Sequence, residues 1–143
     1  VGSVGRARNF ASRVDAAIAI VDKRRPKANA IEVMNVIGDV KDKCCVMLDD
    51  MIDTAGTICQ GAQALVDNGA KEVYACCTHG VLSGPAMERL TASPIKEIVV
   101  LDTINLPDNV KNNPKIKVLS VAKLIAKAIT SIYSDSSLSA IYE

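Results

Sequence analysis

Short apolar runs alternate along this chain with segments of helical periodicity, and this alternation most constrains the fold. The runs that predict strands, several of them β-branched, are Ala17–Val21, Val33–Ile37, Cys44–Leu48, Val73–Thr78, Ile98–Leu101 and Lys117–Leu119. Because several runs are apolar on both faces, they fit a mostly parallel sheet. Strand–helix alternation of this kind predicts an α/β fold in which helices cover both faces of the sheet.

The segments between the strands carry apolar stripes at helical spacing. The stripes comprise Ala7, Phe10, Ala11 and Val14, then Ile58, Ala62, Leu65 and Val66, and finally Val121, Leu124, Ile125, Ala128, Ile129 and Ile132. Ser83–Pro85 predicts a helix start with a capping serine and an early proline. Asp67–Gly69 predicts a turn, and we expect polar loops at Arg24–Ala30 and Asn105–Lys115.

The length of 143 residues fits a single domain, residues 1–143, with a buried core.

A formal net charge of +1 gives no electrostatic reason to expect nucleic acid or an anionic membrane as a partner. No apolar run approaches the roughly 20 residues of a membrane span. Because Val1 is neither an initiator methionine nor the start of a signal peptide, we expect the chain to be part of a longer protein.

The cysteines do not form a recognisable metal or disulfide pattern. They are Cys44, Cys45, Cys59, Cys76 and Cys77, an odd number without CxxC spacing, and the chain has one histidine. This pattern argues against a zinc site and against a disulfide framework. We therefore expect buried free thiols, a reducing compartment and a cytoplasmic location.

The candidate site is the acidic segment that follows the predicted strand Cys44–Leu48. Asp49, Asp50 and Asp53 crowd the end of this strand, and Thr54–Thr57 opens the next predicted helix. Ligands of open parallel sheets bind beyond the carboxyl ends of the strands. We therefore expect this segment to bind the ligand.

The residue types in the segment suit a phosphorylated sugar. Ala55 and Gly56 are small enough to let backbone N–H groups approach an anion at the helix start, and Thr54 and Thr57 add hydroxyl donors. The leading aspartates can accept hydrogen bonds from vicinal hydroxyls or hold a hydrated Mg²⁺. A pentose 5-phosphate offers both a phosphate and a diol. The alternatives are solvated turn residues that cap the helix and the acidic site of a phospho-acceptor receiver domain.

Several motifs together resemble one family, the ribose-phosphate diphosphokinases or phosphoribosyl pyrophosphate (PRPP) synthetases, and specifically the C-terminal half of that chain. The matching segments are Gly5–Arg8, Asp22–Pro26, Asn35–Gly38, Asp49–Thr57, Gly69–Ala75, Thr78–His79 and Leu82–Pro85. The resemblance implies a type I phosphoribosyltransferase-like domain from a two-domain protein. It also implies transfer of diphosphate from ATP to ribose 5-phosphate, which gives PRPP and AMP.

The resemblance also assigns roles to residues. Lys23 and Arg25 would be catalytic residues on the family's flexible loop, and Arg25 would also contact ribose 5-phosphate. Asp49, Asp50 and Asp53–Thr57 would form the ribose-5-phosphate site. Cations brought over the phosphates would stabilise the charge that develops during transfer.

Other implications concern what lies outside the chain. The family's metal-binding aspartate would immediately precede Val1, and the ATP contacts and metal histidine would lie in the N-terminal half, so we assign no metal ligand here. The resemblance implies Mg²⁺, ATP and ribose 5-phosphate as ligands, and assembly into homodimers and hexamers. For His79 we expect a structural role. A non-catalytic regulatory relative and a base-accepting phosphoribosyltransferase are the alternative functions.

Overall fold

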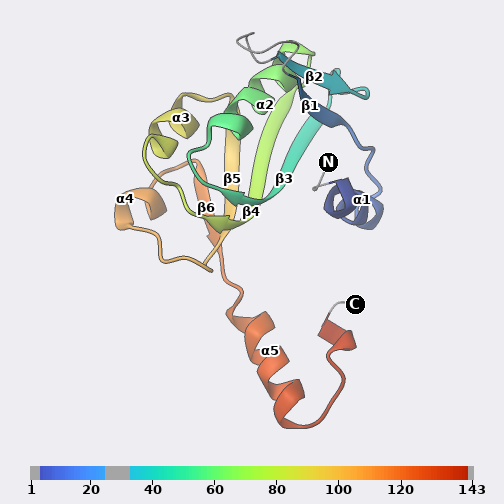
Figure 1. The fold of residues 1–143 in the computed structure, drawn as a ribbon, viewed down its shortest axis with the longest axis vertical. Coiled ribbons are helices and arrows are strands. Elements are labelled where there is room, and N and C mark those ends of the chain that lie inside the picture. Colours follow the sequence, from blue (N-terminus) through green and yellow to red (C-terminus); the bar gives the residue numbers. More distant parts are fainter. Residues whose placement is uncertain (1–3, 25–32, 142–143) are drawn as a thin grey trace.

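The computed structural model of this chain describes residues 4–24 and 33–141 (Figure 1). Its elements in chain order are α1 (Val4–Arg13), β1 (Ile20–Arg24), β2 (Val33–Ile37), β3 (Cys44–Ile52), α2 (Gly56–Asp67), β4 (Glu72–Gly80), α3 (Ala86–Ala92), β5 (Ile95–Leu101), α4 (Asp108–Lys111), β6 (Ile116–Leu119), α5 (Ala122–Tyr133) and the short 3-10 helix η1 (Ser139–Ile141).

A four-stranded parallel sheet forms the centre of the fold. Its strand order is β3-β4-β5-β6, the same as the order along the chain. All three neighbouring pairs are parallel, with Cys45 opposite Val73 and Ile98 opposite Ile116. The prediction of an α/β fold with a mostly parallel sheet is therefore confirmed.

The core lies between one face of the sheet and the helices α2 and α3. Along β4, buried and partly exposed residues alternate because successive side chains of a strand point to opposite faces. Val73 and Ala75 on β4 and Ile98 on β5 are each at most 1% exposed. They belong to one apolar cluster with Leu65 of α2 and Leu90 of α3.

The opposite face of the sheet is incompletely covered, although we expected helices on both faces. Val46 and Leu119 remain 49% and 45% exposed. Helix α5 has the amphipathic pattern of a covering helix, yet it extends away from the sheet and buries none of its residues (Figure 1). Among the described residues, no helix combines the length and apolar character needed to cross a bilayer.

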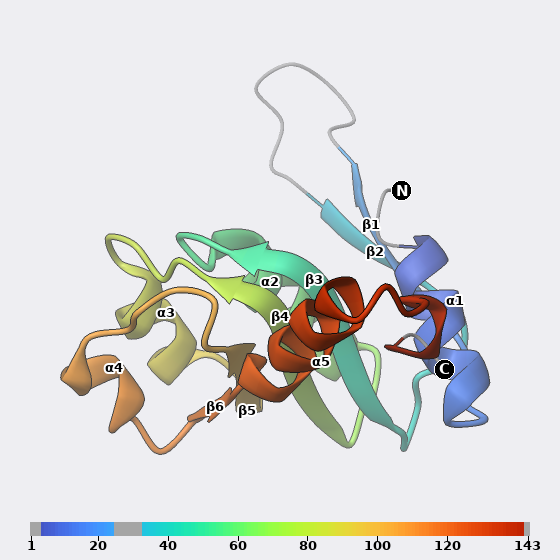
Figure 2. The same cartoon turned by 90° about the horizontal axis from the view of Figure 1, so that it is seen from below.

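Strands β1 and β2 form a separate antiparallel ribbon rather than part of the parallel sheet. Figures 1 and 2 show this ribbon on the β3 side of the molecule, at the opposite end from α3 and α4. β2 has the predicted bounds, whereas β1 lies three residues later than predicted and includes Lys23. Residues 25–32, most of the predicted loop Arg24–Ala30 among them, lie outside the described residues.

The segment Asn105–Lys115, which we predicted to be a polar loop, contains a one-turn helix, α4. Leu106 and Val110 anchor it, because each side chain is 3% exposed. Two apolar side chains among prolines and asparagines were too few to predict a helix from periodicity. The prediction of a turn at Asp67–Gly69 is correct, since Gly69 has a positive φ of 89° directly after α2.

The prediction that all the cysteines are buried is only partly correct. All five are free thiols, but only Cys77 is fully buried and Cys44 is exposed. Cys76 and Cys77 point to opposite faces of β4, as expected for neighbours on a strand. Cys44 is the first residue of β3, at the edge strand of the sheet, which explains its exposure.

Candidate functional site

The three aspartates of the candidate site occupy the end of β3 and the bend that follows it. β3 continues to Ile52, so Asp49 and Asp50 lie within the strand rather than beyond it. Asp53 and Thr54 form the bend before α2. The acidic segment and the helix start therefore meet at the carboxyl end of a parallel strand, where ligands of such sheets bind.

Asp49 and Asp50 interact with each other and with α1. The Asp50 N–H donates to Asp49 Oδ1 at 2.9 Å, and the Met51 N–H donates to Asp50 Oδ1 at 2.9 Å. Arg6 Nη2 lies 3.4 Å from Asp50 Oδ2. Desolvation raises the pKa of Asp49, whereas the side-chain hydrogen bond with Asp49 is the main cause of the lowered pKa of Asp50. Asp50 is thus the carboxyl more readily ionised.

The start of α2 can accept an anion. Its N-cap residue, Ala55, has a left-handed conformation with φ 60° and ψ 6°, and it makes no side-chain capping bond. No acidic residue occupies the first turn, which begins with Gly56 and the exposed Thr57. Since the first N–H groups of a helix lack intrahelical partners, they can donate to a phosphate at this point.

The bend at Asp53 is held by the segment after β4. The Ser83 hydroxyl donates to Asp53 Oδ1, and the Ser83 N–H donates to the Asp53 carbonyl at 3.1 Å. We predicted that Ser83 would cap α3, and this is wrong: the N-cap of α3 is Pro85, without a side-chain capping bond. The serine contributes to the candidate site instead.

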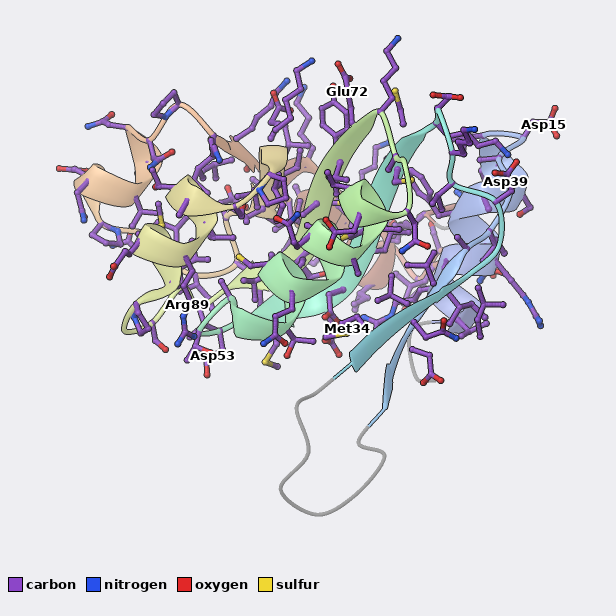
Figure 3. The ribbon with its side chains drawn as sticks, turned by 90° about the horizontal axis from the view of Figure 1, so that it is seen from above. Asp15, Met34, Asp39, Asp53, Glu72 and Arg89 are labelled. Carbon is purple, nitrogen blue, oxygen red and sulfur yellow. The ribbon has the colours of Figure 1, made fainter. Side chains whose placement is uncertain are left out.

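Two arginines near the site were not predicted. Arg89 on α3 donates from Nη1 to the Thr54 carbonyl at 3.0 Å, and Figure 3 shows Arg89 beside Asp53. Arg6 on α1 pairs with Asp50. No local pattern in the sequence could reveal these contacts, because they join residues 35 or more positions apart.

The residues assigned to the flexible loop are only partly described. The backbone of Lys23 pairs with Met34 in the β1–β2 ribbon. Arg25 lies outside the described residues. His79 lies near the end of β4, where its Nδ1 is 2.9 Å from Thr103 Oγ1. The Thr103 hydroxyl in turn donates to the Thr78 carbonyl at 3.0 Å, which links β4 to the end of β5.

The described residues do not form a metal centre by themselves. Within residues 4–24 and 33–141, no group of three or more histidine, cysteine, aspartate or glutamate side chains is placed to hold a metal ion. Asp49 and Asp50 could supply at most two carboxylates, and Asp50 already pairs with Arg6. Mg²⁺ held by so few protein ligands requires water and substrate phosphates to complete its shell.

Comparisons with known proteins point to one family. A family model described as the phosphoribosyl synthetase-associated domain matches residues 23–143. The ribose-phosphate pyrophosphokinases of Clostridium tetani and Clostridium perfringens are 61% and 62% identical over 143 residues, which is 100% of this chain and 44% of each relative. The crystal structure of phosphoribosylpyrophosphate synthetase from Mycobacterium smegmatis superposes with a TM-score of 0.86 at 36% identity, over 95% of this chain and 43% of that one. This chain thus spans less than half the length of these relatives.

Proposed function

Because this chain belongs to the phosphoribosyl synthetase-associated domain family, we propose that it supplies the sugar-phosphate site of an enzyme that makes PRPP. The reaction transfers diphosphate from ATP to ribose 5-phosphate and releases AMP. The observation that carries this proposal is the acidic end of β3 running into the uncapped start of α2. The two features suit the two ends of ribose 5-phosphate, because carboxylates accept bonds from its hydroxyls and helix N–H groups bind its phosphate.

The proposed chemistry needs little beyond positioning and charge stabilisation. The ribose 1-hydroxyl oxygen forms a bond to the β-phosphorus of ATP, the bond from that phosphorus to the α,β-bridging oxygen breaks, and the hydroxyl proton passes to solvent. Asp49 and Asp50 would orient the sugar, and the start of α2 would hold the 5-phosphate. By family resemblance, Lys23 and Arg25 would stabilise the charge on the diphosphate and on the departing AMP.

We also propose that the remainder of the enzyme lies in a second half of the polypeptide. This rests on the family resemblance and on coverage of 44% of the relatives' length. ATP contacts and Mg²⁺ binding would fall mainly to that other half, since the described residues here do not form a metal centre. We therefore expect little or no turnover from the 143-residue chain alone.

Self-association is a further part of the proposal. The family resemblance implies homodimers and hexamers, and a helix with an exposed apolar face supports it: Ile129 and Ile132 on α5 are 62% and 64% exposed. Light scattering of the full-length protein would measure its mass in solution. A monomer at micromolar concentration would contradict this part of the proposal.

The test of the activity uses the full-length protein that contains this chain. Formation of AMP and PRPP from ATP and ribose 5-phosphate, with Mg²⁺, would be compared between the wild type, Lys23→Ala and Lys41→Ala. We expect Lys23→Ala to lower kcat on the order of 10²–10³-fold, as for loss of a group that stabilises transition-state charge. Lys41, an exposed residue in the turn before β3, is the matched control and should retain activity.

The outcomes separate the candidate functions. Absence of turnover by the wild-type full-length protein would favour the non-catalytic regulatory relative. Turnover that is unchanged in Lys23→Ala would remove this lysine from the mechanism but leave the enzyme in place. PRPP consumption in the presence of a purine or pyrimidine base, without any AMP formation from ATP, would instead indicate a base-accepting phosphoribosyltransferase.

A further inference from the structure

The turn that leads from β3 into α2 is held along its whole length by the segment that follows β4. The Leu82 N–H donates to the Ile52 carbonyl at 3.0 Å, and the Ser83 N–H donates to the Asp53 carbonyl at 3.1 Å. The next carbonyl in the series, that of Thr54, accepts from Arg89 at 3.0 Å. Three successive carbonyls of the turn thus accept hydrogen bonds from one neighbouring segment. The donors to Ile52 and Asp53 are backbone N–H groups, whereas the donor to Thr54 is a side chain.

Arg89 holds the peptide unit that joins Thr54 to Ala55, directly before the start of α2 where the anion would bind. The Thr54 carbonyl and the Ala55 N–H belong to one planar trans peptide, so they point in opposite directions. A donor fixed on the carbonyl therefore directs the Ala55 N–H away from Arg89 and fixes its orientation. Ala55 also has φ 60°, a left-handed conformation that a residue with a side chain adopts only when its surroundings enforce it.

The platform that carries Arg89 is itself rigidly placed. Leu90, the next residue of α3, is 1% exposed in the core. The Lys115 ammonium binds the carbonyls at the end of α3, at 3.1 Å from Leu90 O, 2.9 Å from Thr91 O and 2.8 Å from Ser93 O. Gly56 leaves room for the guanidinium, because a Cβ at this position would lie 3.3 Å from Arg89 Nη1.

We propose that Arg89 is a positioning residue for the phosphate of ribose 5-phosphate. Its guanidinium fixes the Thr54–Ala55 peptide so that the N–H groups of the turn converge on the phosphate. It places a positive charge at the same helix start. This inference rests on the proposed function, because it assumes that the start of α2 binds the sugar phosphate.

The kinetic test compares Arg89→Ala, Arg89→Lys and Glu88→Ala in the full-length protein. We expect Arg89→Ala to raise KM for ribose 5-phosphate about tenfold, the size expected for one hydrogen bond to a charged group, with KM for ATP unchanged. Arg89→Lys keeps one charged donor and should recover part of the loss, and methylguanidinium added to Arg89→Ala should do the same. Glu88 is the matched control, an exposed neighbour on α3.

A second measurement needs no substrate. Amide hydrogen exchange at Ala55–Thr57 should accelerate in Arg89→Ala and not in Glu88→Ala, while the melting temperatures stay similar. Unchanged exchange and unchanged KM in Arg89→Ala would overturn the inference. Equal losses for both substrates together with a lower melting temperature would overturn it as well, since they would indicate general destabilisation. Wild-type protein without turnover would contradict the proposed function, and the exchange experiment would still decide the role of Arg89.

Discussion

At the scale of single residues, the five cysteines differ in burial and therefore in the reactivity of their thiols. Cys77 is 5% exposed, and burial raises its pKa to about 11, so almost none of it is thiolate near neutral pH. Cys44 is exposed at the edge strand. We expect a thiol reagent at pH 8 to modify Cys44 first and Cys77 only after unfolding, as measured by mass spectrometry of the labelled peptides. Equal labelling rates for the two in the native protein would contradict the described packing of β4.

The candidate site could be predicted from the sequence only where its residues are close together in the chain. Asp49, Asp50 and Thr54–Thr57 are candidates because their spacing places acids and small residues where a strand meets a helix, and the structure confirms that placement. Ser83 and Arg89 contact the same turn although they lie 30 and 35 positions from their partners in the sequence. The directions of their side chains depend on how α3 and the segment before it pack. Local spacing contains no information about that packing.

At the scale of elements, the end of α3 depends on a lysine. The Lys115 ammonium is the donor to three carbonyls at the end of this helix. Lys115→Met should remove these bonds and lower the free energy of unfolding by about 1–3 kcal/mol. Lys117→Met, a matched change at an exposed position of β6, should have little effect. Urea denaturation measures both, and equal stabilities would show that the Lys115 bonds contribute nothing.

The start of α5 should depend on pH through Asp102. Asp102 Oδ1 accepts the Val121 N–H at 2.8 Å. The pKa of Asp102 is lowered from its ordinary value of 3.8, first by the Ser120 hydroxyl and then by this N–H. Because the folded pKa is the lower one, the stabilisation is complete above about pH 4 and is lost as the pH falls through the folded value.

The pH dependence can be followed at the backbone amides of α5 by NMR. We expect the first turn of α5 to loosen below the ordinary pKa of Asp102 before the sheet unfolds. In Asp102→Ala the first turn should already be loose at neutral pH, with no further change on acidification over that range. A first turn in Asp102→Ala that matched the wild type at neutral pH would show that the carboxylate does not cap this helix.

The elements that the sequence predicted correctly are those with strong, local periodicity. β2 has the predicted bounds, and α2 begins within the predicted helix start Thr54–Thr57 and contains the whole predicted stripe from Ile58 to Val66. α4 was missed because it comprises a single turn, too short to show a helical period. The ribbon of β1 and β2 could be predicted as strands but not as a separate sheet, since apolar content does not specify the pairing partner.

At the scale of the whole molecule, the two sides of the fold should respond differently to the same substitution. Ile98 is 0% exposed and Ile129 is 62% exposed. Ile98→Ala should lower the free energy of unfolding by about 2–5 kcal/mol, because it leaves a cavity in the core. Ile129→Ala should change it by no more than about 0.5 kcal/mol.

The comparison applies to the 143-residue chain and uses chemical denaturation of each variant. A large loss for Ile129→Ala would show that α5 packs against the chain in a way that the structure does not contain. In the full-length protein the same substitution should become costly if the apolar face of α5 is covered there. The prediction that helices cover both faces of the sheet assumed that α5 packs on the sheet. An amphipathic pattern shows that one face of a helix needs an apolar partner, but it does not show which surface supplies that partner.

The strand order of the sheet has a consequence for how the chain is made. β4, β5 and β6 each pair with the strand that precedes them in the sequence, so none of these three strands waits for a partner from a distant part of the chain. The sheet can therefore grow one strand at a time from β3 as the polypeptide leaves the ribosome. Short sequence separation between pairing strands reduces the loop-closure cost and favours rapid assembly. Helix α5 follows the four strands of this sheet in the sequence, so its apolar face leaves the ribosome after the strands that form the core.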